Sequence, residues 1–285
     1  MAGKHSRREA GSHGAATRLW LSGLLLFLAL LMALYPSTAQ WFSARNQHQL
    51  LLEARNRITE IEPAERNAML EAAHLYNQDL ARGKIPLTYE EELNPLGDGQ
   101  MARTRIPVIG VDLPVFHDTS SQVLRRGAGH VASTTLPVGG ESTHAGISAH
   151  SGLPSATLFT NLSKVKEGDT FYVDVLDETL TYRVTRIQIV KPDEAEYLYI
   201  EDGKDLVTLI TCTPIGINTD RILVTGERVP DEPEEVVEEP LPQGAGFPWW
   251  ALIGGAGTTG ILAGVLLMDR KARRKKATRS TPHRS

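Results

Sequence analysis

Cys212 is the only cysteine in a chain of 285 residues. It ends a run of strand-forming residues within the segment 208–229, which reads TLITCTPIGINTDRILVTGERV. Pro214 follows closely and ends the strand, because proline cannot donate to a sheet ladder. A free cysteine is often a small buried filler, but a side chain at a strand end more often meets a loop-lined surface. The position therefore also suits a nucleophile, whose reactive form is the thiolate.

A working thiolate needs a basic or cationic neighbour. Arg221 follows Cys212 after a turn-rich stretch and starts the next apolar run, so two antiparallel strands can bring both residues to one end of a sheet. The alternative for Arg221 is a solvated charge at a strand end. His150, in ISAHSGLPS, lies between an apolar run and a Gly-Leu-Pro turn, which favours an exposed loop. His130 and His144 remain alternatives, although either could equally be a partly buried structural residue.

Other chemistries find less support. Four histidines lie close together at spacings of 13, 14 and 6, which match neither a helical metal pair nor a thiolate zinc cluster: His117, His130, His144 and His150. The carboxylates are scattered and there is no glycine-rich phosphate loop. We therefore expect no metal and no cofactor. A single cysteine also excludes an intramolecular disulfide.

Two long apolar runs enclose the middle of the chain. Residues 19–35 contain no charge over 17 positions, and residues 247–268 contain none over 22. About 20 helical residues cross a hydrocarbon core, so both runs predict transmembrane helices. For the first run a cleaved signal is the alternative, because STA at 37–39 resembles a signal-peptidase site.

Basic residues gather outside these runs. Of 30 Lys and Arg residues, four lie in residues 1–18 and eight in residues 270–285. The positive-inside rule then predicts a two-pass protein of the cell membrane, with both termini in the cytoplasm and the middle of the chain outside. The basic tails contain no interleaved aromatic residues, so we expect no nucleic acid partner.

The middle of the chain changes texture near residue 99. Helical periodicity before it, with Pro63 as a helix divider, gives way to short apolar runs between turn residues, which predict a mainly β barrel. The predicted order is a basic tail (1–18), a transmembrane helix or signal segment (19–35), a helical segment with a connector (36–98), a catalytic β-barrel (99–230), an acidic Pro-rich tether (231–246), a transmembrane helix (247–268) and a basic tail (269–285).

These segments together resemble a known family. TLITCTPIGINTDRILVTGERV, preceded by IPVIGVDLPVFHDTS and by GAGHVASTTLPVGGESTHAGISAHSGLPSATLFTNLSKVKEGDTFYV, is similar to the sortases, the cysteine transpeptidases of Gram-positive cell surfaces. The match is strongest with class C, the pilus-assembling sortases. It covers roughly residues 68–229 and contains several linked motifs in the family's order.

The resemblance implies a fold, a triad and a reaction. It implies an eight-stranded β-barrel in which Cys212 is the nucleophile, with His150 and Arg221 as its catalytic partners. Thr211, Thr213 and Ser151 are then expected to line the substrate cleft. The substrate would carry a Leu-Pro-any-Thr-Gly sorting signal, cleaved between Thr and Gly through a thioacyl enzyme. A pilin lysine would resolve that enzyme in the pilus class, or a peptidoglycan cross-bridge amine in the anchoring class.

Some residues depart from the class C pattern. The connector at 82–99 lacks the usual Asp-Pro-aromatic lid motif, which predicts an open or differently covered cleft. Ser151 replaces the usual Arg after the histidine, and Ile215 replaces the usual aromatic residue after Thr-Cys-Thr-Pro. Besides an anchoring sortase, two alternatives stay open: a secreted cysteine protease that uses water, and a catalytically silent adhesin with a structural cysteine.

Overall fold

A computed structural model describes residues 6–84, 86–192, 194, 196–230 and 247–279. The expected tether at 231–246 lies outside these residues. The chain divides into two compact units, one made of Met1–Ala39 with Phe247–Ser285 and the other of Gln40–Gly246.

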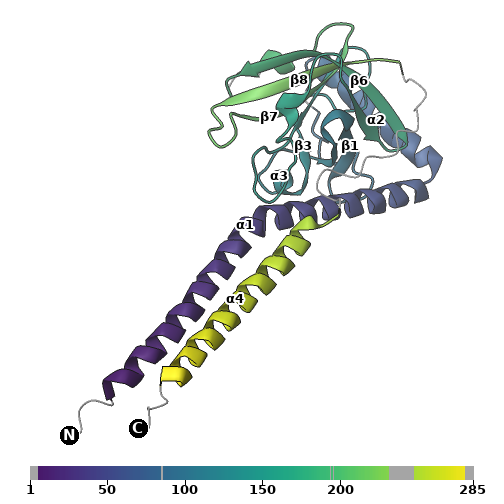
Figure 1. Ribbon diagram of the computed structural model, residues 1–285. Helices are drawn as coiled ribbons and strands as arrows, with labels where there is room; N and C mark the ends of the chain where they lie inside the picture. The colour runs from purple at the N-terminus through teal and green to yellow at the C-terminus, as the bar shows by residue number, and fades with distance from the viewer. Residues whose placement is uncertain (1–5, 85, 193, 195, 231–246, 280–285) are drawn as a thin grey trace, which may run out of the picture. The chain divides into compact units, whose positions relative to one another are not determined.

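The elements of the chain are drawn in Figure 1. The helices are α1 (Ser6–Glu60), α2 (Pro63–Ala81), α3 (Val123–Arg126) and α4 (Trp249–Arg279), with 3-10 turns η1 (Pro107–Ile109), η2 (Leu162–Lys164) and η3 (Glu196–Leu198). The strands are β1 (Gln100–Ile106), β2 (Val111–Phe116), β3 (Ala128–His130), β4 (Thr143–Ser148), β5 (Thr170–Val175), β6 (Glu178–Val190), β7 (Asp205–Thr213) and β8 (Asp220–Arg228).

Within the described residues, eight strands close into a barrel in the order β1-β2-β3-β4-β7-β8-β6-β5. The pairs β2–β3 and β4–β7 are parallel and the other pairs are antiparallel. The eight-stranded barrel expected from the sequence is confirmed. Strands β4 and β7 finish, and β8 begins, at one end of the barrel, which we call the β4–β7 end. Strand β1 begins and β2 finishes at the opposite end.

The apolar run IPVIGV is not a single strand. It contains the end of β1, the turn η1 and the start of β2. Strand β6 contains a β-bulge between Val184 and Arg186. The extra residue keeps the apolar side chains of the strand on one face, because Leu180, Tyr182 and Val184 belong to the main core and Ile187 packs against it. Val190 lies on the other face, where it pairs with Arg221.

Two helices precede the barrel, and their division is as expected. Helix α1 ends at Glu60 and α2 begins at Pro63, where proline suits a first helical position. Helix α1 is continuous from Ser6, so no break separates the apolar run from the helical segment after it, although Pro36 lies inside.

Helix α2 closes the opposite end of the barrel. Leu70, Ala73 and Tyr76 join the main core, which the inward faces of the strands share. Asn77 fixes the helix in place: its side-chain amide donates to the carbonyl of Leu136 at 2.9 Å and accepts from the amide of Leu136 at 2.7 Å. Because Leu136 lies in the β3–β4 connection, α2 is attached to the end of the barrel where β4 begins.

The connector before β1 continues this closure. The Tyr89 hydroxyl lies 2.9 Å from Nδ1 of His130, and the Asp118 amide donates to the same hydroxyl at 3.1 Å. Both ring nitrogens of His117, directly after β2, lie within 2.9 Å of backbone carbonyls of Glu92 and Gly99. These contacts hold the connector at the end of the barrel where β1 begins. None of them places it over the β4–β7 end.

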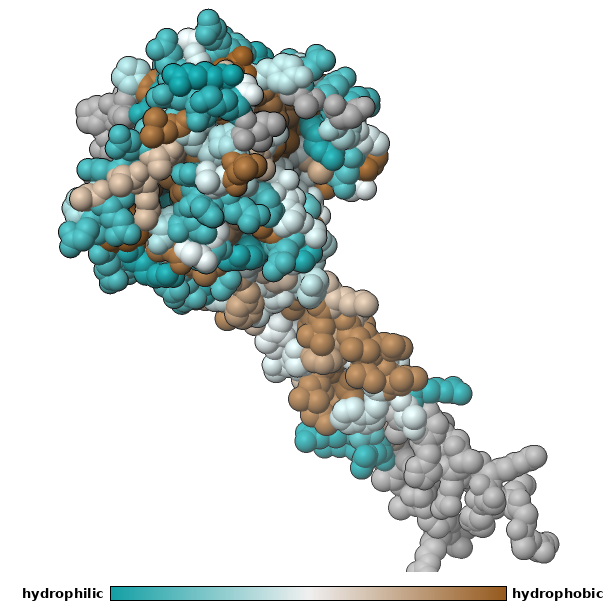
Figure 2. All heavy atoms as spheres, turned by 180° about the vertical axis from the view of Figure 1, so that it is seen from behind, coloured by the Kyte–Doolittle hydropathy of each residue, from teal (hydrophilic) through white to brown (hydrophobic). Residues whose placement is uncertain are grey.

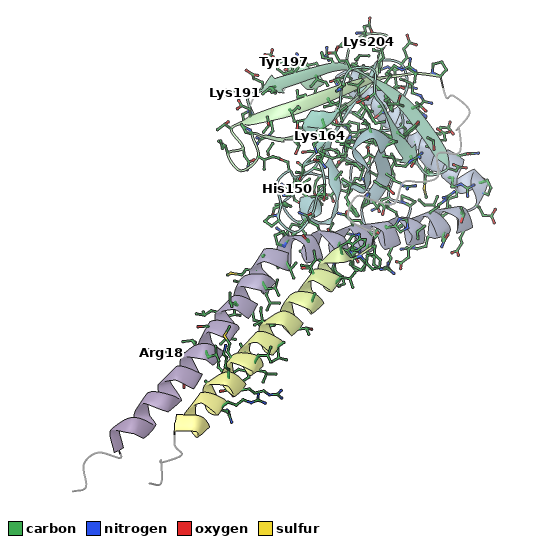
Figure 3. The ribbon with its side chains drawn as sticks, in the orientation of Figure 1. Arg18, His150, Lys164, Lys191, Tyr197 and Lys204 are labelled. Carbon is green, nitrogen blue, oxygen red and sulfur yellow. The ribbon has the colours of Figure 1, made fainter. Side chains whose placement is uncertain are left out.

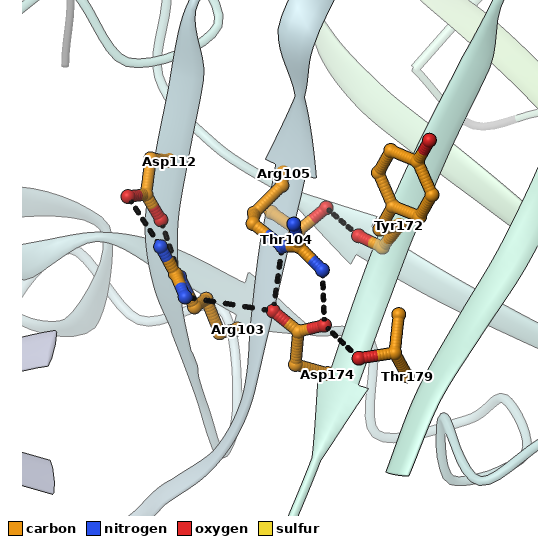
Figure 4. A network of polar contacts seen from close by, with 7 residues as sticks. All are labelled: Arg103, Thr104, Arg105, Asp112, Tyr172, Asp174 and Thr179. Atoms are coloured by element: carbon orange, nitrogen blue, oxygen red, sulfur yellow. Dashed lines mark hydrogen bonds and ion pairs between the residues drawn. The ribbon is translucent and has the colours of Figure 1, made fainter. Parts of the chain in front are cut away.

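Ion pairs on the outer face join β1 to both of its neighbours (Figure 4). Arg103 contacts Asp112 of β2 at 2.6 Å and Asp174 of β5 at 3.8 Å, while Arg105 contacts Asp174 at 2.8 Å. The guanidinium of Arg105 also lies over the ring of Tyr172. These side chains are less than a fifth exposed, so salt screens the pairs less than it would screen fully exposed ones.

The first unit consists of the beginning of α1 and helix α4. Among the described residues, two helices are long and apolar enough to cross a membrane, Thr17–Glu60 and Trp249–Arg274, with mean hydropathies of 2.1 and 1.8 in their most apolar windows. Figure 2 shows their apolar side chains in brown. Glycines let the two helices approach: a Cβ on Gly23 would lie 2.7 Å from Val265, and one on Gly257 2.8 Å from Leu30.

His130 makes stability depend on pH. It is fully buried, and its Nε2 donates to the Thr135 carbonyl at 2.8 Å, which leaves Nδ1 to accept from Tyr89. Burial lowers the pKa of His130 to about 4, from an ordinary value of 6.5. The unfolded chain therefore takes up this proton first, and the contribution of His130 to the free energy of unfolding is lost as pH falls from 6.5 to 4.

We expect the purified chain to lose about 3 kcal/mol of stability to this one group over that window. Chemical denaturation at a series of pH values measures it, with His130→Gln for comparison, because glutamine does not titrate. Equal pH slopes in the two proteins would contradict the prediction.

Candidate active site

Cys212 and Arg221 are direct neighbours across two strands. Strands β7 and β8 are antiparallel, and in their register Cys212 pairs with Arg221 and Thr213 with Asp220. Paired residues of antiparallel strands project from the same face of a sheet, with Cβ atoms about 5 Å apart. The side chains of Cys212 and Arg221 therefore project side by side from the same face of the barrel wall, as the sequence spacing predicted.

His150 belongs to the same row. Strands β4 and β7 are parallel, and Ser148, the last residue of β4, pairs with Ile210. The chain continues along β7 for one more residue, because the Ala149 amide donates to the Ile210 carbonyl at 3.1 Å. His150 and Cys212 each lie two residues after a member of the Ser148–Ile210 pair. Side chains two residues apart in a strand lie on the same face, so continuing this register puts His150 alongside Cys212. Figure 3 labels His150 in the loop after β4.

This row lies on the outer face of the barrel. The neighbours of Cys212 on its own face form a small apolar cluster, separate from the main core, in which Val190, Ile210 and Leu223 are buried. Val131 packs against the cluster, as do Tyr197 and Leu198 of the β6–β7 connection. Cys212 itself is half-buried and has no disulfide partner. The thiol is thus at a surface, next to an apolar region.

The hydroxyl groups around the row hold the loop in place. Thr211, which is buried, donates to the Ala149 carbonyl at 2.7 Å, and Ser151 donates to the Cys212 carbonyl at 2.7 Å. Thr213 is half-buried at the end of β7. The expectation that Thr211, Thr213 and Ser151 line a substrate cleft stays a prediction. The hydroxyls of Thr211 and Ser151 hold the backbone of the His150 loop against β7.

The guanidinium of Arg221 is held by the backbone of the β7–β8 connection. Its Nη1 donates to the carbonyl of Asp220 at 3.0 Å and to that of Asn218 at 3.3 Å. The carboxylate of Asp220 accepts from Lys191 at 2.5 Å, and this contact lowers the pKa of Asp220. The same pair fastens the start of the β6–β7 connection beside the site.

The other candidate histidines lie away from the thiol. His144 is fully buried, with Nε2 2.7 Å from the Thr208 hydroxyl and Nδ1 2.8 Å from the Tyr199 carbonyl. Burial lowers its pKa below the ordinary value. His130 belongs to the closure at the opposite end of the barrel. The structure therefore places only His150, of the three histidines considered, in the row with Cys212 and Arg221.

Sequence reasoning missed Gly152 as a shaping residue of the site. Its φ is +70°, a left-handed conformation that favours glycine, and a Cβ there would lie 2.4 Å from Cγ2 of Ile215. Ile215, in the β7–β8 connection, thus packs directly over the His150 loop. The Gly-Leu-Pro turn was the available signal, but it does not reveal which side chain covers the glycine.

A metal centre finds no support in the geometry. Across the residues that the structure describes, no three His, Cys, Asp or Glu side chains are arranged to hold a metal ion.

Comparisons with known proteins agree with the fold. The family model described as the sortase domain matches residues 104–229. Sortase C1 from Streptococcus agalactiae is 38% identical, with 65% of this chain and 100% of that chain covered and a TM-score of 0.62. Sortase C-1 from Actinomyces oris is 44% identical over 59% of this chain and 100% of that chain, with a TM-score of 0.55.

This chain therefore belongs to the sortase family, and its structural neighbours are sortases of class C. Sortases are cysteine transpeptidases. Among curated relatives, sortase A of Bacillus anthracis is 32% identical over 45% of this chain and 60% of its own length. Sortase A of S. agalactiae is 33% identical over 43% and 50%. The chain thus spans half to three-fifths of the length of these curated relatives.

The contact between Gly152 and Ile215 can be tested. Gly152→Ala should cost about 1–3 kcal/mol of stability, because it combines backbone strain with a steric overlap. It should also displace Ile215 and lower activity on any substrate that uses the site. Thermal unfolding and turnover measure the two effects.

Gly203→Ala is a matched control, since its φ is +75° and nothing lies within 4 Å of the position of a Cβ. Adding Ile215→Ala to Gly152→Ala should restore part of the loss. If the two alanine variants behave alike, the overlap with Ile215 has no effect of its own.

Proposed function

We propose that this chain is a membrane-anchored sortase that cleaves a Leu-Pro-any-Thr-Gly-like sorting signal between Thr and Gly and joins the threonine to an amine, a pilin lysine. The observation that carries the proposal is the pairing of Cys212 with Arg221 across β7 and β8, with His150 two residues after the Ser148–Ile210 pair of the neighbouring strand. Its class C neighbours, whose chains are covered almost fully, support the pilus assignment over the cell-wall anchoring one.

The first half-reaction forms a thioester. The thiolate of Cys212 attacks the threonine carbonyl carbon, and the electron pair of the carbonyl moves onto its oxygen. Arg221 stabilises this negative charge with donors that keep their protons at every physiological pH. The bond between carbon and nitrogen then breaks, and protonated His150 donates a proton to the leaving glycine nitrogen.

The second half-reaction reverses these roles. The acceptor amine attacks the thioester carbonyl, and neutral His150 takes the proton that the amine loses. The carbon–sulfur bond breaks, the thiolate of Cys212 returns, and an amide bond joins the two substrates.

The helices support the proposed location. Both long apolar helices have basic residues on their terminal sides, so we propose a two-pass arrangement with the termini in the cytoplasm and the barrel outside the cell. The barrel then meets sorting-signal-bearing proteins on the outer surface of the membrane, where class C enzymes join pilins.

Removal of the thiol tests the chemistry. The full chain in detergent is incubated with a sorting-signal peptide and hydroxylamine, and the peptide hydroxamate is measured. Cys212→Ala should reduce it to background, because no thioester can form without the sulfur. Hydroxamate from the alanine variant would rule out the thiol mechanism. If added amines changed neither the rate of cleavage nor the product, the result would instead indicate a protease that uses water.

Removal of the imidazole tests the proposed proton transfer. His150→Ala should lower the rate of hydroxamate formation by a factor of about 10²–10⁴, the usual contribution of a positioned acid and base. His74→Ala is the control, because His74 is half-buried on α2 at the opposite end of the barrel. Comparable losses in the two variants would refute the role of His150.

A further inference from the structure

Two side-chain hydroxyls continue the sheet where the backbone of β4 leaves it. In a continued parallel ladder, the Ala149 carbonyl would accept from the amide of Cys212, and the Cys212 carbonyl would accept from the amide of Ser151. Here the hydroxyl of Thr211 donates to the Ala149 carbonyl, and the hydroxyl of Ser151 donates to the Cys212 carbonyl. Both distances are 2.7 Å, typical of good O–H···O bonds.

His150 is the residue between these two bonds. On its first side Ala149 is tied to β7 twice, through its amide and its carbonyl. On its second side the hydroxyl of Ser151 donates to the Cys212 carbonyl of β7. After Ser151 the chain turns away from the strand, because the Gly152 amide donates to the Thr160 hydroxyl at 2.9 Å. The carbonyl of His150 accepts from Phe159, which also belongs to that loop.

The Ser151 bond ends on the residue that carries the sulfur. A shift at Ser151 therefore changes the separation of His150 and Cys212. Reactions of this kind are sensitive to such separations, since a misplacement of about 1 Å can cost roughly 10² in rate.

We propose that Ser151 is a positioning residue for the transpeptidation, and that its hydroxyl holds the imidazole of His150 beside the sulfur of Cys212. The inference rests on the proposed function, and it deepens that function by assigning to Ser151 a role that does not require contact with substrate. Ser151 acts through His150, so its effect must vanish when His150 is absent.

The first test separates the hydroxyl from the rest of the side chain. In the full chain, Ser151→Ala should lower kcat for hydroxamate formation at least tenfold with KM changed less than twofold, because a misplaced proton donor slows the chemical step and leaves substrate binding alone. Ser151→Thr keeps the hydroxyl and should recover kcat to within about threefold of the wild type. Ser155→Ala, in the same loop but exposed, is the matched control and should equal the wild type.

A kcat for Ser151→Ala equal to that of Ser155→Ala would overturn the proposal. So would a threonine variant as slow as the alanine variant, because the lost contribution would then not be the hydroxyl. A thermal unfolding midpoint measured for each variant identifies any that fails to fold.

The second test needs no substrate. A charged thiol reagent alkylates Cys212, and His150→Ala should slow the reaction several-fold, because a neighbouring imidazole promotes the thiolate. Ser151→Ala should slow it by a similar factor, and the double variant should be no slower than His150→Ala alone. Independent, multiplying effects would show that Ser151 does not act through His150.

The two tests distinguish the inference from the function on which it rests. If the wild type forms no hydroxamate but the alkylation rates couple as described, the proposed reaction is wrong and the positioning role of Ser151 stands. If Cys212-dependent hydroxamate forms and the alkylation rates do not couple, the reaction stands and the positioning role falls.

Discussion

The register of β4, β7 and β8 is the constraint on which the site depends. Side chains alternate between the two faces of a strand, so a slip of one residue in either pairing would send one member of the row into the core. The pairs Ser148–Ile210 and Cys212–Arg221 prevent this slip. The inward residues of the same strands, among them Ile147, Leu209 and Val224, are fully buried. A slip would therefore also expose apolar side chains, and packing of the core enforces the geometry of the surface row.

The outer face of β4, β7 and β8 has three successive zones along the strands. Next to the thiol lie the apolar residues Ile210 and Leu223. Further along the same strands Thr208 and Thr225 share a hydrogen bond at 2.8 Å, and the ring of His144 links Thr208 to the carbonyl of Tyr199. One sheet face thus changes from a closed polar network to an apolar cluster and then to the half-exposed reactive groups. The covered part fixes the β6–β7 connection, because Nδ1 of His144 donates to the Tyr199 carbonyl.

Much of this could be predicted from the sequence, for identifiable reasons. Cys212, Pro214 and Arg221 are close in the chain, and a short turn between two strands has few arrangements, so their proximity could be predicted locally. The place of His150 depends on a parallel pairing between strands more than 50 residues apart. No local pattern reveals that pairing, and it was the family resemblance that implied His150 as a partner of Cys212. The bulge at Thr185 and the packing of Ile215 on Gly152 depend on neighbours that no local pattern reveals. The contact of Asn77 with Leu136 was out of reach for the same reason.

The closure of the barrel by α2 means that the segment recognised by homology is smaller than the unit that folds. The sortase match begins at residue 104, yet Leu70, Tyr76 and Leu93 are part of the main core. A chain cut at the homology boundary would expose that core at one end. During synthesis the amino-terminal part emerges first, so α2 leaves the ribosome before the barrel that it will seal. The barrel wall that it closes is complete only with β8, more than 130 residues later. Strand β8 and helix α2 therefore finish folding together.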